Sequence, residues 1–221
     1  MKGGDKMVYC LFEQSGTFKN IFKSKGIDAI DIDIENKFGQ TDLIIDLFAA
    51  IKKLPDGFLS DITSNDLIIA FFPCTWFSDN NMLLFNGTSY SMRNWTAEQK
   101  RTYIIKRRHD RIIAYQTLIK LIRHCKLHKI PLIVENPVSH YLIHTLGQYT
   151  IAHRRDRYGD KLQKRTMYYC YNCTINENKL SVYNNKVSGN KVQKLRGINR
   201  SLMSREYAEN IINAIERCEK Q

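Results

Sequence analysis

Short apolar stretches alternate with segments of helical periodicity in the first part of the chain. Residues 7–12 form an apolar run that ends in a polar turn, and residues 27–34 alternate isoleucine with aspartate or alanine. Both patterns are typical of strands. Between them Phe18, Ile21 and Phe22 recur at helical spacing, and Gly26 lies where that helix would end. Strand, helix and strand over so short a span predict a βαβ unit.

The alternation continues through the middle of the chain. Residues 66–72 form a nearly all-apolar run that stops at Pro73, and residues 130–134 form another that we expect to end at Glu135-Asn136-Pro137, where proline interrupts a regular ladder. Residues 96–128 predict a long helix with a basic outer surface, and residues 204–216 predict a closing helix. The apolar stripe predicted for the long helix comprises Ile105, Ile112, Tyr115, Ile119 and Ile122, and that of the closing helix comprises Tyr207, Ala208, Ile211, Ile212 and Ile215.

This order of elements predicts an α/β protein with a Rossmann-like, doubly wound, mostly parallel sheet. At 221 residues, the chain is long enough for one sizeable domain and short for two, so we expect a single domain over residues 1–221. The pattern weakens after Tyr141, and residues 176–194, which are rich in Asn and Lys, predict a hairpin or a loop. We therefore expect at most a small insertion, over residues 154–198.

Charge favours a polyanionic partner. Lys and Arg number 34 against 22 Asp and Glu, which gives a formal net charge of +12. Each phosphate that a basic protein neutralises releases bound counterions, so nucleic acid is the leading partner and a basic protein without such a partner is the alternative. We find no signal peptide and no run of membrane-spanning length, and we expect a cytoplasmic protein without a membrane partner. The oligomeric state stays open.

Six cysteines at irregular spacing do not predict a disulfide framework. Cys170 and Cys173 form a CxxC pair, but no second pair or His-x-His cluster accompanies them, and the flanking residues 167–169 and 174–175 have strand character. We therefore predict no metal site.

Candidate chemistry lies where strands end, because ligands of doubly wound sheets bind beyond the carboxyl ends of the strands. Cys74 follows the buried strand 66–72, where a thiolate can act as a nucleophile, although a buried cysteine that packs as a small hydrophobe is the alternative. Glu135 ends the next strand and supplies the carboxylic acid that a ring-attacking cysteine needs as its proton partner. The two side chains should then face one cleft.

Two further loops could hold a small ligand at the same edge. Residues 12–17 contain Gly16 and could bring backbone close to a ligand, or form a plain turn. Asp31 or Asp33, about twenty positions on, could accept hydrogen bonds from ribose hydroxyls, or be a solvated loop acid.

Taken in order, these residues resemble the cytosine 5-methyltransferase family, in particular its small, phage-type members. The resemblance runs from about Val8 to Ile215. It is carried by the loop Phe12-Glu13-Gln14-Ser15-Gly16-Thr17, with Glu13-Gln14 where glycine or alanine is usual, by Asp33, by Pro73-Cys74 with the trailing Ser78, by Glu135-Asn136-Pro137, by Tyr158-Gly159 followed by Gln163-Lys164-Arg165, and by Asn199-Arg200-Ser201. The order and spacing of these strings are more specific than any one of them.

The resemblance implies the cofactor S-adenosylmethionine, double-stranded DNA as the partner and a very short target-recognition region. Catalytic roles would fall to Cys74, Glu135 and Arg165, with Asn136 bracing the catalytic loop. Cofactor contacts would come from Phe12, Gly16, Thr17, Asp33, Asp46, Pro73 and Ser201. Nucleic-acid contacts would come from Ser78, Arg154, Arg155, Arg157 and Gln163, where a solvated charged face is the alternative for each arginine.

Addition of the Cys74 thiolate to carbon 6 would make carbon 5 of cytosine a nucleophile for the methyl group, and Glu135 would stabilise the protonated ring nitrogen. Because neither face of the ring is reachable inside a duplex, the target base should be flipped out. An enzyme that acts on RNA, and a non-catalytic member that binds nucleic acid or cofactor, are the alternative hypotheses.

Overall fold

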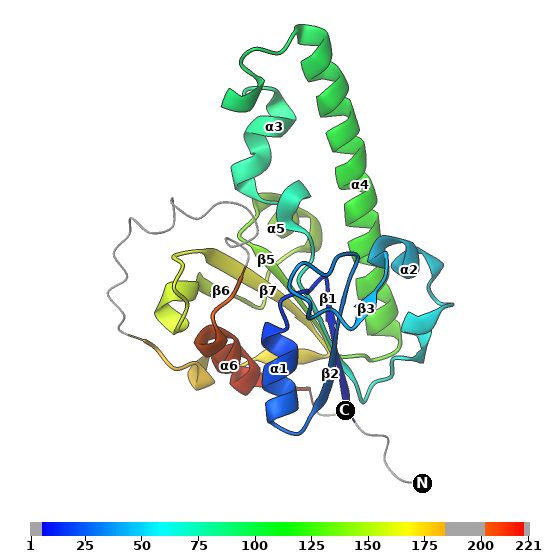
Figure 1. The fold of residues 1–221 in the computed structure, drawn as a ribbon, viewed down its shortest axis with the longest axis vertical. Coiled ribbons are helices and arrows are strands. Elements are labelled where there is room, and N and C mark those ends of the chain that lie inside the picture. The colour runs from blue at the N-terminus through cyan, green and yellow to red at the C-terminus, as the bar shows by residue number, and fades with distance from the viewer. Residues whose placement is uncertain (1–5, 184–201, 219–221) are drawn as a thin grey trace.

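The computed structural model describes residues 6–183 and 202–218, and its centre is a seven-stranded sheet (Figure 1). The strand order is β3-β2-β1-β4-β5-β7-β6. Strands β1 to β5 run parallel, and β7 is antiparallel to both of its neighbours. The strands are β1 Met7–Leu11, β2 Asp28–Asp33, β3 Leu43–Ile44, β4 Leu67–Ala70, β5 Leu132–Pro137, β6 Ile151–Arg154 and β7 Arg165–Tyr171, and β8 Cys173–Ile175 pairs with β9 Ile215–Arg217 in a separate ladder. The prediction of an α/β protein with a mostly parallel sheet is confirmed, and the order is compatible with Rossmann-like winding.

Helices cover both faces of the sheet. Helices α1 (Thr17–Ser24) and α6 (Arg205–Ala214) pack together on one face, while α2 (Leu47–Lys53), α4 (Ala97–Leu127) and α5 (His140–Leu146) pack on the other (Figure 1). Strand side chains alternate between two buried clusters: in β4, Leu67 and Ile69 join the α1/α6 side, and Ile68 and Ala70 join the α2/α4 side. Burial on both faces explains why this strand is continuously apolar.

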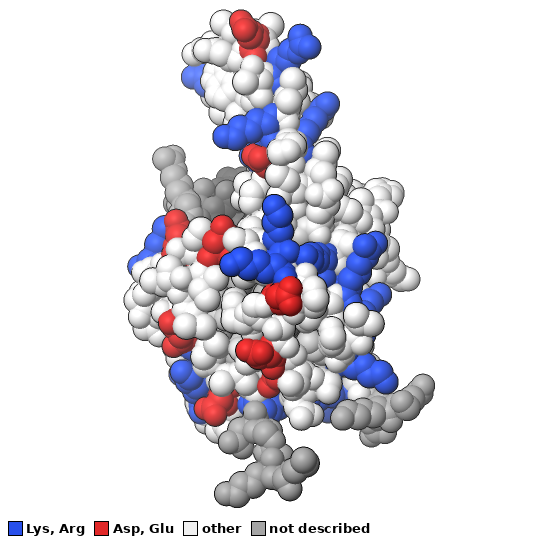
Figure 2. All heavy atoms as spheres, turned by 90° about the vertical axis from the view of Figure 1, so that its right-hand side faces the viewer, with Lys and Arg blue, Asp and Glu red and all other residues white. Residues whose placement is uncertain are grey.

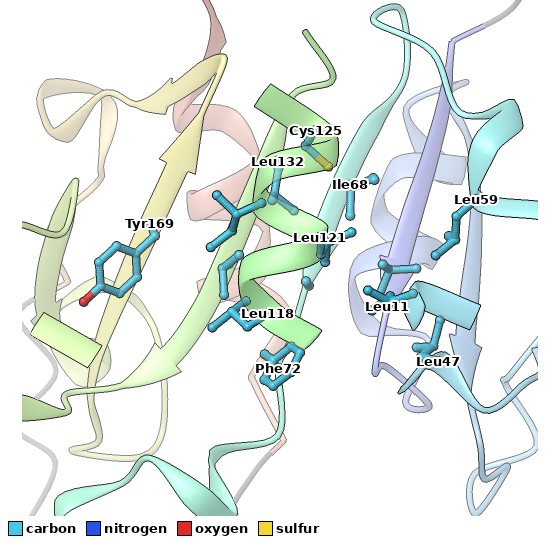
Figure 3. Close-up of a cluster of buried hydrophobic side chains, with 14 of the residues drawn as sticks. Leu11, Leu47, Leu59, Ile68, Phe72, Leu118, Leu121, Cys125, Leu132 and Tyr169 are labelled. Atoms are coloured by element: carbon cyan, nitrogen blue, oxygen red, sulfur yellow. The ribbon is translucent and has the colours of Figure 1, made fainter. Parts of the chain in front are cut away.

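The second half of α4 forms the centre of one cluster (Figure 3). Ala114, Leu118, Leu121 and Cys125 recur at spacings of four, three and four residues and are fully or almost fully buried against the sheet. Truncation of a leucine at such a position to alanine typically costs about 2–5 kcal/mol of unfolding free energy. At its other end α4 begins with a capping box between Thr96 and Gln99.

The first half of α4 extends beyond the sheet, where only the short helix α3 (Met82–Asn86) and the turns around it accompany it (Figure 1). The predicted apolar stripe is therefore wrong at its start, because Ile105 is 58% exposed and Ile112 is 52% exposed. The helical periodicity of α4 extends beyond the sheet, so its first turns have no sheet to pack against. Residues 82–111, with α3 and the first half of α4, are called the arm below.

Two element boundaries also differ from the prediction. Strand β5 continues through Pro137, because β7 pairs with it as far as Thr166 although β4 stops pairing at Val134. Helix α6 ends at Ala214, so Ile215 belongs to β9 and not to the helical stripe. No helix in the described part of the chain carries an apolar stretch sufficient to cross a bilayer.

Candidate functional site

Three adjacent parallel strands bring three loops to one edge of the sheet. Strands β1, β4 and β5 lie side by side, and the segments that follow β1 and β4, together with the end of β5, line a cavity of about 250 Å³. The side chains of Cys74 and Glu135 both line this cavity. The structure thus places the two candidate catalytic groups together at the carboxyl ends of neighbouring strands, where doubly wound sheets bind their ligands.

The loop that carries Cys74 is fastened at both ends. The half-buried Cys74 opens a 3-10 turn, Cys74–Trp76, immediately after Pro73. Before it, the Asn136 side-chain amide donates a hydrogen bond of 2.9 Å to the carbonyl of Phe72, and after it the Ser139 hydroxyl donates one of 2.6 Å to the carbonyl of Phe77. Because both donors belong to the segment that begins with Glu135, the thiol and the carboxyl group are held by one connected framework.

Glu135 is 6% exposed, and its carboxylate accepts a hydrogen bond from the hydroxyl of Thr166, which is fully buried on β7. Strand β7 runs antiparallel to β5 and places Thr166 opposite Pro137, close enough to reach back to Glu135. A hydrogen bond to a charged carboxylate is stronger than one between neutral groups and fixes the direction of the acceptor.

Four of the seven predicted cofactor residues lie at the cavity. Phe12, Thr17, Asp33 and Pro73 line the cavity. Burial raises the pKa of Asp33, while hydrogen bonds from the backbone of Glu35 and Ile34 oppose that shift. This carboxyl group is thus partly desolvated where β2 ends, beside the loop that follows β1.

Gly16 shapes that loop without lining the cavity. Its φ of 74° is a left-handed conformation that favours glycine, and a Cβ atom would lie 2.8 Å from the side-chain nitrogen of Asn20 and 2.9 Å from the side-chain oxygen of Gln40. Asp46, by contrast, caps helix α2 and accepts hydrogen bonds from the backbone of Phe48 and Ala49. It does not line the cavity.

Glu13 and Lys164 line the cavity and were missed as site residues in the sequence. Burial raises the pKa of Glu13; the hydrogen bonds from Ser15 oppose that shift, and the carboxylates of Asp33 and Glu135 add to it. Among the described residues, the cavity lining therefore includes three carboxyl groups and one cation, Lys164. The unusual Glu13-Gln14 pair was the signal for the first of these, whereas a lysine between Gln163 and Arg165 gave none. Apolar residues from two other segments complete the lining and also went unpredicted: Phe38, Leu202 and Met203.

The predicted nucleic-acid residues do not lie at this cavity. Arg155 is fully buried, where its guanidinium pairs with Asp160 and donates a hydrogen bond of 2.7 Å to the carbonyl of Leu202, so its assignment to a phosphate-binding surface is wrong. Ser78 is 7% exposed, and its backbone amide donates a hydrogen bond to the carbonyl of Cys74, so it closes the turn that carries Cys74.

The remaining residues are at or near the surface. Arg154 forms a two-bond ion pair with Asp156, with distances of 3.1 and 2.6 Å, while Arg157 is exposed. Gln163 is half-buried, and Arg165 is exposed at the start of β7 and does not line the cavity, whereas its neighbour Lys164 does. Ser201 and residues 184–198 of the predicted insertion lie outside the described residues.

Comparison with models of known protein families gives no match, and comparison with curated proteins gives none either.

Proposed function

We propose that this protein is an S-adenosylmethionine-dependent methyltransferase that modifies carbon 5 of cytosine in DNA. The observation that carries the proposal is the shared cavity of Cys74 and Glu135 at the carboxyl edge of a mostly parallel sheet, with Asp33 in the same lining. A nucleophile, an acid–base partner and a buried carboxylate at the end of β2 are the three groups that the resemblance to the cytosine 5-methyltransferases requires.

The charge of the cavity suits this cofactor. In the part of the chain that the structure describes, three carboxyl groups, from Glu13, Asp33 and Glu135, and one lysine line the cavity. Such a site favours a ligand with a cationic centre, because an opposite charge compensates carboxylates that burial has partly desolvated. S-adenosylmethionine has a sulfonium cation and, when bound, supplies an electrophilic methyl group. Phe12, Thr17, Asp33 and Pro73 would hold it, and Asp33 would accept hydrogen bonds from the ribose.

Cys74 supplies the nucleophile. Its sulfur would form a bond to carbon 6 of a cytosine in the cavity, and the ring electrons would move to carbon 5, which then takes the methyl group. Loss of the proton from carbon 5 and departure of the Cys74 thiolate restore the ring. Asn136 and Ser139 fix the loop through this sequence, since their side chains hold the carbonyls on either side of the nucleophile.

Glu135 would hydrogen-bond the ring nitrogen that gains a proton as the thiolate adds. Its carboxylate is buried and oriented by Thr166, so the charge that develops on the ring meets a fixed counter-charge and not mobile water. The base must enter the cavity alone, which requires it to leave the duplex stack.

The direct experiment is transfer of a radiolabelled methyl group from S-adenosylmethionine to polynucleotides. We expect transfer to cytosine-containing DNA by the wild type, none by Cys74→Ser, and a decrease of about 10²-fold or more in kcat for Glu135→Gln. Cys218→Ser is the matched control, because that cysteine is exposed at the end of β9 and does not line the cavity. Equal transfer by Cys74→Ser and the wild type would refute the proposal, and transfer to RNA but not DNA would assign the site to the RNA enzyme.

A further inference from the structure

The arm is strongly basic and rises from the edge of the sheet that holds the cavity (Figure 1). Residues 82–111 contain seven Lys and Arg against two Asp and Glu. Figure 2 shows Lys and Arg side chains on the projecting arm and on the body beneath it. A polyanionic substrate would therefore meet a basic surface on the arm beside a cavity that is lined by carboxyl groups.

Three of these arginines hold the arm together. Arg107 donates a hydrogen bond of 2.6 Å to the carbonyl of Thr75, the residue after Cys74, while Arg108 donates one of 3.3 Å to the carbonyl of Phe85. The guanidinium of Arg111 lies 3.2 Å from the centre of the Phe85 ring. The arm is thus fixed both to itself, through α3, and to the loop that carries the nucleophile.

Basic side chains of the arm, Arg108 among them, also line a groove between α3 and α4. The groove has a volume of about 530 Å³, and its cations are Lys100, Arg101 and Arg108. Asn86 adds an amide and Ile104 and Ile105 add apolar surface, and no acidic residue of the described chain lines it. Three cations without an acid, together with a side-chain amide, are the groups that proteins direct at phosphate oxygens.

We infer that this groove binds the sugar-phosphate backbone of the DNA whose cytosine enters the cavity. The inference rests on the proposed function. The carboxyl groups of Glu13, Asp33 and Glu135 repel phosphates, so the affinity for the strand must come from a separate basic surface. The groove supplies that surface, and the bond from Arg107 to Thr75 connects its helix to the catalytic loop. The main phosphate contacts then come from this groove and not from the arginines named in the sequence analysis: Arg154, Arg155, Arg157 and Arg165.

The test measures binding without chemistry. Fluorescence anisotropy of a labelled 20-base-pair, cytosine-containing duplex, with no S-adenosylmethionine present, compares the wild type, Lys100→Gln/Arg101→Gln and the control Lys52→Gln/Lys53→Gln over a range of salt concentrations. The control removes the same charge from the exposed end of α2. We expect the arm variant to bind at least about tenfold more weakly near 0.1 M salt, and the slope of log K against log salt to fall by about 2, because each lost phosphate contact removes about 0.9.

The control should keep the affinity of the wild type within about threefold. An arm variant that binds as tightly as the wild type, or a control that weakens binding equally, would overturn the inference, as would a wild type that binds no DNA. Two measurements on Cys74→Ser, DNA binding by anisotropy and methyl transfer with S-adenosylmethionine, distinguish the two proposals. This substitution abolishes methyl transfer if the proposed function holds and leaves the groove intact. Loss of transfer with normal binding therefore bears on the cavity, and loss of binding bears on the groove.

Discussion

Arg155 provides the sharpest test of the packing around the cavity. Its guanidinium is fully buried; Nε donates a hydrogen bond of 2.6 Å to Asp160, and Nη2 donates one of 2.7 Å to the carbonyl of Leu202, a residue that lines the cavity. Arg155→Met keeps much of the side-chain volume and removes the charge, so the carboxylate of Asp160, which is 2% exposed, loses its counter-ion. Breaking a buried pair from one side costs about 3–5 kcal/mol of unfolding free energy.

That loss is a large share of the roughly 5–15 kcal/mol that stabilises a typical protein. In a protein of this size it should lower Tm by about 6–20 °C, and urea unfolding should show the same loss as a lower midpoint. Arg157→Met is the matched control, since Arg157 is exposed two residues away and should change the free energy by no more than about 0.5 kcal/mol.

A double variant completes the test. Arg155→Met/Asp160→Leu removes both charges and should be more stable than Arg155→Met alone, because no uncompensated carboxylate is left in the interior. A loss below about 1 kcal/mol in Arg155→Met, or a double variant no more stable than the single one, would show that the pair is not buried as described.

Three further predictions concern single side chains. Burial raises the pKa of Asp31 to about 7, with Glu13 adding to the shift, so the folded state takes up the proton more readily and stability should fall by at most about 4 kcal/mol as pH rises from 4 to 7. In urea titrations the unfolding free energy of Asp31→Asn relative to the wild type should therefore increase over that range, and a constant difference would contradict this. Burial, aided by the charge of Arg155, lowers the pKa of His153 to about 4, so the unfolding free energy should decrease as pH falls from 6.5 to 4. In the same titrations His153→Gln should lose about 3 kcal/mol less than the wild type over that range. Thr166→Val removes the hydrogen bond to Glu135, so it should lower the unfolding free energy by about 2 kcal/mol and kcat/KM for methyl transfer by about 30-fold. Thr166→Ser keeps the hydroxyl and should behave nearly as the wild type. Equal values for the two variants would refute this role of the hydroxyl.

The sequence predicted β1, β2, β4 and β5, but it did not place β3, β6 or β7 in the central sheet. Strands that are buried on both faces, such as those in residues 66–72 and 130–134, are nearly continuous apolar runs in the sequence. Each run ends at the edge of the sheet, where Cys74 and Glu135 follow. Cys74 and Glu135 therefore lie together because β4 and β5 are neighbouring parallel strands. Local pattern and topology together were sufficient for that juxtaposition.

The arm and the buried arginine could not be predicted in the same way. Ile105 and Ile112 continue the helical stripe of α4, and nothing in the local pattern shows that the sheet ends before them. Arg155 lies in a run of basic residues that is typical of a surface, and long-range contacts, such as that with Leu202, hold its side chain in the interior. Asp46 likewise differs from the prediction, because its carboxylate accepts hydrogen bonds from the backbone of the first turn of α2 and caps that helix.

In the proposed reaction the Cys74 sulfur forms a bond to a cytosine ring, and trapping on DNA that contains 5-fluorocytosine measures this directly. Fluorine replaces the proton at carbon 5 whose loss would release the enzyme. The wild type with S-adenosylmethionine should therefore gain the mass of the oligonucleotide, and peptide mapping should place the adduct on Cys74. Cys74→Ser should form no adduct, while Cys218→Ser should form as much as the wild type. A wild type that gives no adduct with DNA, or an adduct that persists in Cys74→Ser, would contradict the central claim.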